Sequence, residues 1–445
     1  MPTKPRLAGL ALLAASALAL TGCATGAAET SSGSLAKLDP DKKISIVFES
    51  YNLATAGAWT NTIEGLIADF ETEHPNITVI GQGVASDQTT SSVQTQLLAG
   101  NPPDVAQLTF DALDYAVTEL GAQPLEDLVG SKAIDDHLGG EHPFQERAAV
   151  LADWEGKTIG LPYVFSTPVL FYNASAFEAA GVPADVDLST WDAVKTVATK
   201  ITAATGKPAI NLACAVKGGN WCMQGVFRSN EARVLSEDRS TIEFGEPEAI
   251  EAVEMLRDLY DAGVLTNLDQ ASQTEAFSRG DAVMQLQSSA AQSNYIGAAK
   301  AGGWELRAAA MPGFTGKQVV PTNSGSALFM FSTDPQKQAA AWEFMKFLTS
   351  EHAYETITTG IGYLPLRTSL TEPGEPLEWY ATNPLATANL AQLADLEPWT
   401  SYPGNSYTQI DDILATAIEE SVFYGKDPAK TMADAQKRAQ TLIED

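Results

Sequence analysis

The chain has 445 residues and carries 56 acidic side chains against 27 basic ones, a net charge of −29 at pH 7. This excess of negative charge excludes proteins that hold nucleic acid or anionic membranes through basic patches, although solubility in a salty or exposed setting would explain it equally well. The length is enough for two packed domains, each with a sizeable core.

The N-terminus predicts export. Lys4 and Arg6 precede an uncharged apolar stretch over residues 7–20, which is the order of a signal peptide and is too short for a comfortable bilayer span. The Leu-Thr-Gly-Cys segment that ends at Cys23 resembles the bacterial lipobox, in which the cysteine is diacylated and becomes the first residue of the mature chain. We therefore expect a lipoprotein signal peptide over residues 1–22 and a lipid on Cys23.

Residues 23–40 are rich in Ser, Gly, Ala and Thr, a composition typical of a flexible tether. Two lipid chains anchor a soluble domain stably. We therefore expect the protein on the outer face of the bacterial cytoplasmic membrane, touching the membrane through that anchor only. The alternative is an ordinary signal peptide followed by an incidental cysteine.

Hydrophobic spacing predicts alternating strands and helices after the tether. A short apolar run at 44–48 has strand character, and a helix with one apolar face follows it. That face consists of Ile63, Leu66, Ile67 and Phe70. His74-Pro75 breaks the helix before a second strand around 77–79, and residues 97–108 give a helix end, a glycine stop, a proline loop and a third strand. This alternation indicates βαβ units with a largely parallel sheet.

The same alternation restarts after residue 165. Residues 274–287 predict a helix that ends near Gly280 and then a strand. Helical stripes follow over 336–350, where Trp342 is expected to pack, and over 410–422, and Asp427-Pro428 supplies an N-cap and a first-turn proline for the last helix. The chain is therefore predicted to be an α/β protein of two lobes.

Two cysteines remain besides Cys23. Cys214 and Cys222 bracket a Gly-Gly turn at 218–219. Outside the cytoplasm such a pair can close a small disulfide loop. The alternative is that both thiols stay reduced.

The usual signatures of an enzyme are missing. The sequence has no HExxH, no G-x-S-x-G, no phosphate-binding loop and no Cys/His cluster with metal spacing. The four histidines are scattered, and a surface pair is favoured over a metal site at His137 and His142. We therefore expect no metal, no cofactor and no catalysis. A carboxylate-based glycosidase is the enzymatic alternative.

Five segments, in order along the chain, resemble the family 1 extracellular solute-binding proteins, the capture subunits of ABC importers for sugars and related polyols. They are GNPPDVAQL at 100–108, LPYVFSTPVLFYNASAFEAAGV at 161–182, FSRGDAVM at 277–284, AAWEFMKFLTS at 340–350 and TTGIGYLPLR at 358–367. The resemblance covers residues 44–445. Within the family the chain is most similar to the glycerol-3-phosphate-binding branch.

This resemblance implies a two-lobed, periplasmic-binding-protein-like (type II) α/β fold whose lobes close on ligand about a hinge. The N-terminal lobe would comprise 41–163 and 326–365, and the C-terminal lobe 166–312 and 370–445. It also implies a monomer that passes its ligand to the permease subunits of an ABC transporter. A structural or adhesive lipoprotein would not need such hinge-like segments.

The resemblance also implies the ligand-binding residues. They are Glu49, Asp111, Ser166, Trp221, Ser288, Ser289, Gly325 and Tyr363, and the loop aromatics Trp399 and Tyr402 are expected to join them. Carboxylates, amides and stacking aromatic rings are the side chains that suit sugars. Alternatives stay open for four of them: Glu49 as a solvated loop acid, Asp111 as the N-cap of a helix over 112–120, Gly325 as a glycine that only permits a tight turn, and Tyr363 as an ordinary packing residue.

The chain departs from the glycerol-phosphate branch at Tyr402, where that branch places an arginine for phosphate. A tyrosine offers no charged bidentate fork, and beside Pro403 this loop tyrosine is expected to lie outside the central core. The sequence therefore favours a neutral carbohydrate, a di- or oligosaccharide. Glycerol-3-phosphate or a glycerophosphodiester is the alternative, with Arg367 or backbone amides holding the phosphate.

Overall fold

The computed structural model describes residue 33 and residues 35–444, so Cys23 and the signal segment lie outside the described residues. The last part of the expected tether lies against the protein. Leu35 and Leu38 pack on the hydrophobic core. The Gln336 side chain donates to the carbonyl of Lys37 at 2.9 Å and accepts from the backbone N–H of Asp39 at 2.9 Å.

The first sheet has five strands in the order β2-β1-β3-β11-β6. Their bounds are β1 Ile44–Ser50, β2 Ile77–Gly83, β3 Val105–Thr109, β6 Leu161–Ser166 and β11 Ser324–Met330. β1 runs parallel to β2 and β3, whereas β11 is antiparallel to β3 and β6. Four of the five strands therefore run in one direction, in agreement with the largely parallel sheet expected from the sequence, and β11 alone runs the opposite way after its return from far along the chain.

Helices bury their apolar stripes around the first sheet. They are α1 Ala58–Glu73, α2 Thr89–Leu98, α3 Leu113–Thr118, α4 Leu125–Val129, α5 Ser131–Leu138, α6 Glu146–Ala149, α13 Pro335–Leu348 and α14 Glu351–Gly360. The predicted face of α1 is buried at Ile63, Leu66 and Phe70, and the Phe70 ring lies edge-on to Phe344 of α13 at 5.0 Å. Trp342 is buried in the same core, as expected. β4 Asp153–Trp154 and β5 Lys157–Thr158 form a separate two-stranded ribbon.

The second sheet has four strands in the order β10-β7-β9-β8. Their bounds are β7 Pro168–Asn173, β8 Ile210–Leu212, β9 Met284–Ser288 and β10 Leu306–Ala310. β8 is parallel to β9, and β7 is antiparallel to both β9 and β10. This sheet also has one reversed strand, β7, which enters directly from β6, and its other three strands run in one direction.

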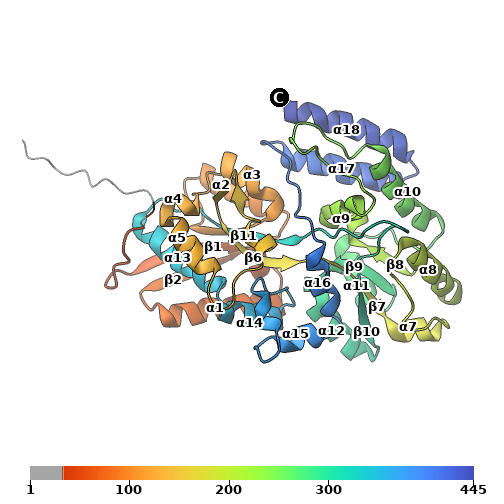
Figure 1. Cartoon of the computed structure of the whole chain (residues 1–445), viewed down its shortest axis with the longest axis horizontal. Coiled ribbons are helices and arrows are strands. Elements are labelled where there is room, and N and C mark those ends of the chain that lie inside the picture. Colours follow the sequence, from red (N-terminus) through yellow and green to blue (C-terminus); the bar gives the residue numbers. More distant parts are fainter. Residues whose placement is uncertain (1–32, 34, 445) are drawn as a thin grey trace, which may run out of the picture. The chain divides into compact units, whose positions relative to one another are not determined.

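Further helices accompany the second sheet. They are α7 Ala174–Ala179, α8 Trp191–Thr205, α9 Met223–Arg228, α10 Pro247–Asp261, α11 Gln270–Ser278, α12 Gln292–Gly302, α15 Glu378–Thr382, α16 Thr387–Ala391, α17 Tyr407–Val422 and α18 Pro428–Glu444. α17 and α18 lie side by side and contact α10 (Figure 1). No helix within residues 35–444 is long and apolar enough to cross a membrane.

The chain passes between the sheets at neighbouring points. Thr167 alone separates β6 of the first sheet from β7 of the second. The return runs from β10 to β11, and the Ser324 end of β11 pairs with Ser166 at the end of β6. Both sheets are therefore assembled from segments that are distant in sequence and meet at this crossing.

Candidate ligand-binding site

The strand order of the first sheet reverses at β1, which pairs with β2 on one edge and β3 on the other. In α/β sheets the carboxyl ends of strands at such a reversal form the usual place for a ligand. Glu49 lies at the carboxyl end of β1, and Asp111 follows β3 in the 3-10 helix η2, Phe110–Ala112. The structure thus brings two of the expected residues to one edge.

Glu49 is fully buried, so the alternative of a solvated loop acid is wrong. Its Oε2 accepts hydrogen bonds from Ser92 Oγ, at 2.9 Å, and from Gln96 Nε2, both on α2. Burial raises the pKa of this carboxyl group, and the two hydrogen bonds oppose the rise. Its Oε1 has no hydrogen-bond partner. Glu49 therefore keeps one acceptor available toward the interior.

A buried polar network surrounds the ends of β1, β3 and β11. The Gln107 side chain accepts from Ser50 Oγ at 2.5 Å, and its Nε2 donates to Ser326 Oγ at 2.9 Å and to Asn52 Oδ1 at 3.2 Å. Tyr51 is buried beside this network, and burial raises its pKa to about 12. These polar side chains at strand ends hold the edge of the sheet rigid.

Asp111 is not the N-cap of a helix. α3 begins at Leu113, and no side chain caps its first turn. Burial raises the pKa of the Asp111 carboxyl group, and a hydrogen bond with the Thr109 side chain opposes the rise. Its backbone carbonyl accepts a hydrogen bond from Ser401 Oγ at 2.9 Å. Asp111 therefore lies where the C-terminal segment meets the first sheet.

Asp411 lies opposite and was missed by the sequence analysis. It lies one turn into α17, where its Oδ1 accepts a hydrogen bond from Asn220 Nδ2 at 2.8 Å. Burial raises the pKa of Asp411 to about 7, and the charge of Asp111 contributes to the rise. Asp411 precedes the buried Leu414 and Ile418 by three and seven residues. An acidic residue on the same helix face as buried apolar residues was the signal in the sequence that could have identified Asp411.

The disulfide expected between Cys214 and Cys222 is present, with the two Cα atoms 5.1 Å apart. It closes the loop that carries Asn220 and Trp221 in the 3-10 helix η4, Asn220–Cys222. Trp221 is half-buried and packs against the core. The cross-link therefore fixes the loop that contacts Asp411.

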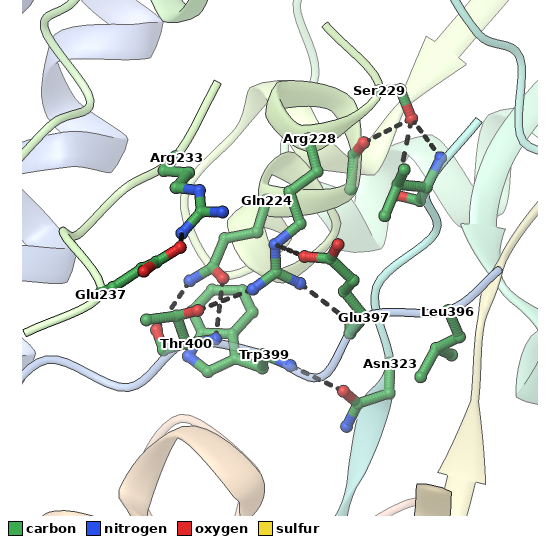
Figure 2. Close-up of polar contacts among 12 residues, drawn as sticks. Gln224, Arg228, Ser229, Arg233, Glu237, Asn323, Leu396, Glu397, Trp399 and Thr400 are labelled. Atoms are coloured by element: carbon green, nitrogen blue, oxygen red, sulfur yellow. Dashed lines mark hydrogen bonds and ion pairs between the residues drawn. The ribbon is translucent and has the colours of Figure 1, made fainter. Parts of the chain in front are cut away.

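Hydrogen bonds from several side chains hold the segment 396–402 in place (Figure 2). Gln224 donates to the carbonyl of Thr400 and accepts from its N–H, both at 2.9 Å. Arg228 donates to Thr400 Oγ1 at 2.6 Å and to the carbonyl of Glu397 at 2.8 Å. Trp399 donates its backbone N–H to Asn323 Oδ1 at 2.8 Å. This segment therefore keeps the half-buried Trp399 and its neighbour Tyr402 in fixed positions.

Tyr402 is more deeply placed than its proline- and glycine-flanked position suggested. It is 1% exposed and belongs to the main core, with its ring edge-on to Phe244 at 6.5 Å. The expectation that this ring lies outside the core is wrong, since the flanking loop folds inward. Its hydroxyl group is buried without a hydrogen-bond partner.

The remaining expected residues lie around the crossing between the sheets. Ser288 Oγ donates to Ser166 Oγ at 2.8 Å, and the buried Ser289 Oγ has no partner. Gly325 has a φ of +124°, and a Cβ there would lie 2.0 Å from the carbonyl oxygen of Val164. This backbone approach requires glycine. Tyr363 is buried, with its ring 5.4 Å from that of Trp59.

Of the fourteen buried polar side-chain atoms without a protein partner in the described residues, seven belong to these residues or to their close neighbours in the chain. They are Glu49 Oε1, Asn52 Nδ2, Ser289 Oγ, Thr322 Oγ1, Asn323 Nδ2, Trp399 Nε1 and the Tyr402 hydroxyl. Folded proteins leave few such atoms, because each costs the free energy of its lost hydration. A set that mixes donors and acceptors matches a ligand rich in hydroxyl groups.

Arg367 does not take part in this site. Its guanidinium group donates to the backbone carbonyls of Thr349, Gly139, His142 and His137, at 3.2, 3.2, 2.5 and 2.7 Å. The side chain is buried and lies over the Phe144 ring. The suggestion that Arg367 holds a phosphate is therefore wrong, because its donors are used in joining segments of the fold.

The described residues contain no group of His, Cys, Asp and Glu side chains arranged to hold a metal ion. His137 and His142 have separate partners, Thr349 Oγ1 at 2.7 Å and Ser369 Oγ at 3.1 Å. Burial lowers the pKa of His137 to about 3, so it remains neutral. The two histidines therefore do not act as a pair.

Two distant sequence relatives are both described as binding proteins. A putative binding protein of Brucella abortus is 26% identical over 387 residues, covering 84% of this chain and 88% of its own. The sn-glycerol-3-phosphate-binding periplasmic protein UgpB of Pectobacterium atrosepticum is 26% identical over 305 residues, covering 65% of this chain and 67% of its own.

Solved structures share the fold. The GacH receptor of Streptomyces glaucescens, known unliganded and with acarbose, superimposes with a TM-score of 0.77 at 19% identity, covering 91% of this chain and 99% of its own. UgpB from Mycobacterium tuberculosis in complex with glycerophosphocholine superimposes with a TM-score of 0.77 at 20% identity, covering 90% of this chain and 98% of its own. The fold is thus the α/β periplasmic-binding-protein fold.

The sequence pattern of one protein family matches residues 65–388 of this chain. The family is described as bacterial extracellular solute-binding protein. The members of this family bind solutes outside the cytoplasm for ABC importers and are not enzymes. This chain, with its mixed sheets, its crossing and its interior polar groups, belongs to the bacterial extracellular solute-binding protein family.

Proposed function

We propose that this solute-binding protein captures a neutral carbohydrate, a di- or oligosaccharide, between two lobes and delivers it to the permease of an ABC importer. The lobes are 41–163 with 326–365, and 166–312 with 370–445. The observation that carries the proposal is the group of buried donors and acceptors without protein partners around Glu49, Asn323 and Tyr402. Hydroxyl groups both donate and accept, so a sugar is suited to satisfy such a mixed set.

Charge favours the neutral ligand over a phosphate. The basic side chains near the site are committed elsewhere: Arg228 to the 397–400 segment and Arg239 to Asp114. A phosphate would meet the carboxyl groups of the buried Glu49 and the half-buried Asp111 without a charged fork to hold it. The structural relatives that hold acarbose, and maltose in a Thermotoga maritima protein, support the same choice.

A glycerol-3-phosphate or glycerophosphodiester ligand is the second candidate. The UgpB proteins among the relatives favour it. Backbone N–H groups, rather than Arg367, would then have to bind the phosphate.

A thermal-shift panel on the chain without residues 1–23 distinguishes the two. The panel contains maltose, maltotriose, acarbose, glycerol-3-phosphate and glycerophosphocholine. A ligand at about 100 times its Kd stabilises the native state by about 2.7 kcal/mol, which raises the melting temperature by several degrees. We expect this shift with at least one uncharged sugar. A shift with the phosphates and with none of the sugars would contradict the proposal.

We also propose that Cys23 carries the lipid anchor, on the basis of the basic, apolar and Leu-Thr-Gly-Cys order of the N-terminus. The mature protein is then expected to begin at a diacylated Cys23. Mass spectrometry of the N-terminal peptide from native membranes checks this expectation. An unmodified cysteine, or cleavage further along the chain, would contradict it.

A further inference from the structure

The segment 236–241 of the proposed C-terminal lobe forms a tight turn. The backbone N–H of Ser236 donates to the carbonyl of Thr241 at 2.9 Å. Asp238 Oδ1 accepts from Ser236 Oγ at 2.7 Å, and from the N–H and the Oγ of Ser240 at 3.1 and 2.8 Å. An aspartate that bonds its own neighbours in this way organises a turn. The shape of the turn is therefore set by contacts inside it.

Arg239 extends from this turn to the proposed N-terminal lobe. Its Nη2 donates to Asp114 Oδ2 on α3 and, at 3.1 Å, to the carbonyl of Ser401. The Asp114 side chain is only 12% exposed, and its Oδ1 accepts a hydrogen bond from Trp154 Nε1 at 2.7 Å. Trp154 belongs to the same lobe as Asp114. It therefore fixes the carboxylate while leaving one oxygen for the arginine of the other lobe.

This ion pair differs from the others that the structure describes. Within the described residues, the other ion pairs of lysine and arginine lie inside one proposed lobe or involve Lys317 between the lobes. Two uncharged contacts also join the lobes. Ser401 Oγ donates to the carbonyl of Asp111 at 2.9 Å, and the Tyr407 hydroxyl lies 3.1 Å from Thr90 Oγ1. Moving the lobes apart would break all three contacts, so the ion pair belongs to the closed arrangement alone.

Arg239 also adopts a backbone conformation that arginine rarely takes. Its φ is +62°, in the left-handed region where a side chain costs conformational free energy that glycine avoids. Such outliers cluster at functional sites. This observation does not depend on the ion pair, and it indicates that the arginine side chain is what this position requires.

We propose that Arg239 and Asp114 form a latch that holds the two lobes closed, and that both are positioning residues for ligand capture. This inference rests on the proposed function, because it needs lobes that open and close. A contact made only in the closed form raises the population of that form with and without ligand. The apparent Kd equals the intrinsic Kd divided by the fraction in the competent form. Where the closed form is the minor one before binding, loss of the latch therefore weakens every ligand by the same factor.

The test compares Arg239→Gln with the matched control Arg233→Gln. The ion-pair partner of Arg233 is Glu237 of the same lobe, 3.0 Å away, so the control loses the same charge and no contact between lobes. Calorimetry with maltotriose and with glycerophosphocholine, neither of which has a net charge, measures Kd. For each ligand that wild type binds, we expect Arg239→Gln to bind about three- to tenfold more weakly, by the same factor, and Arg233→Gln to match wild type. Equal affinity of the two variants, or factors that differ between the ligands, would overturn the latch.

A double variant tests whether the two residues act as a pair. Asp114→Asn keeps the acceptor for Trp154 and removes the charge that faces Arg239. Alone it should weaken binding about as much as Arg239→Gln does. Together the two substitutions should weaken binding no further, because both remove the same interaction. Additive losses would show that the residues act separately and would contradict the proposal.

A measurement without ligand separates failure of this inference from failure of the proposed function. In the chain without residues 1–23, whose other cysteines form a disulfide, Leu98→Cys on α2 is an exposed position for a nitroxide label. The label broadens the methyl signals of Leu414, on α17 of the other lobe, according to how often the lobes are closed. We expect less broadening in Arg239→Gln than in Arg233→Gln, with equal melting temperatures. If this difference appears while maltotriose does not bind, the latch stands and the neutral-sugar proposal fails, whereas equal broadening overturns the latch whatever the ligand.

Discussion

Replacing Arg367 by alanine is expected to lower the free energy of unfolding by about 3–5 kcal/mol. The guanidinium group donates to four backbone carbonyls that come from two distant segments. Its loss leaves those carbonyls without their donors and removes a cation from the face of Phe144, 4.6 Å away. Urea unfolding followed by circular dichroism measures the change.

The matched control is Arg233→Ala, which removes an exposed arginine whose ion-pair partner is Glu237. An exposed ion pair contributes about 0–1 kcal/mol, so this variant should stay close to wild type. Ligand affinity is the second measurement. If Arg367→Ala left stability unchanged and abolished binding, the assignment of Arg367 to the scaffold would be wrong and a phosphate role would return.

Tyr402→Ala is expected to cost about 3–5 kcal/mol of stability, since it leaves a cavity in the core beside Phe244. Tyr402→Phe keeps the ring and removes a buried hydroxyl group that has no partner. The phenylalanine variant should therefore be as stable as wild type or more stable by about 1 kcal/mol.

Ligand binding should respond in the opposite way to stability. If the hydroxyl group contacts the ligand, Tyr402→Phe weakens binding by about 1–2 kcal/mol, or roughly five- to thirtyfold, while the fold is retained. Calorimetry on the phenylalanine variant, with a sugar found by the thermal-shift panel, gives the answer. Unchanged affinity would restrict Tyr402 to a packing role.

Local periodicity was enough to predict much of the secondary structure. The apolar face of α1 and the stripe over residues 410–422 of α17 were predicted correctly, because one buried face dictates the spacing of apolar residues. The reversed direction of β11 was not predictable from local patterns. β11 pairs antiparallel with β3, more than 200 residues earlier in the chain, and nothing within either strand specifies that partner.

The candidate site likewise contains residues that local sequence identifies and residues that only the tertiary fold reveals. Glu49 and Asp111 follow strands, where polar residues at a sheet edge stand out in the sequence. Asp411 was missed because its importance depends on Asn220 and Asp111, which reach it only through the tertiary fold. The depth of Tyr402 was misjudged for the same reason, since Pro403 and Gly404 predict a surface loop and the burial comes from distant packing.

The place of β11 in the first sheet bears on how the exported chain matures. β3 and β6 are joined only through β11, so both strands present unpaired backbone groups until residue 330 has left the secretion machinery. Unpaired edges favour association with other chains, and pairing across such sequence distances is slow. Chains truncated before residue 324 therefore cannot complete the sheet, and most of the protein must be synthesised and exported before the first sheet is complete.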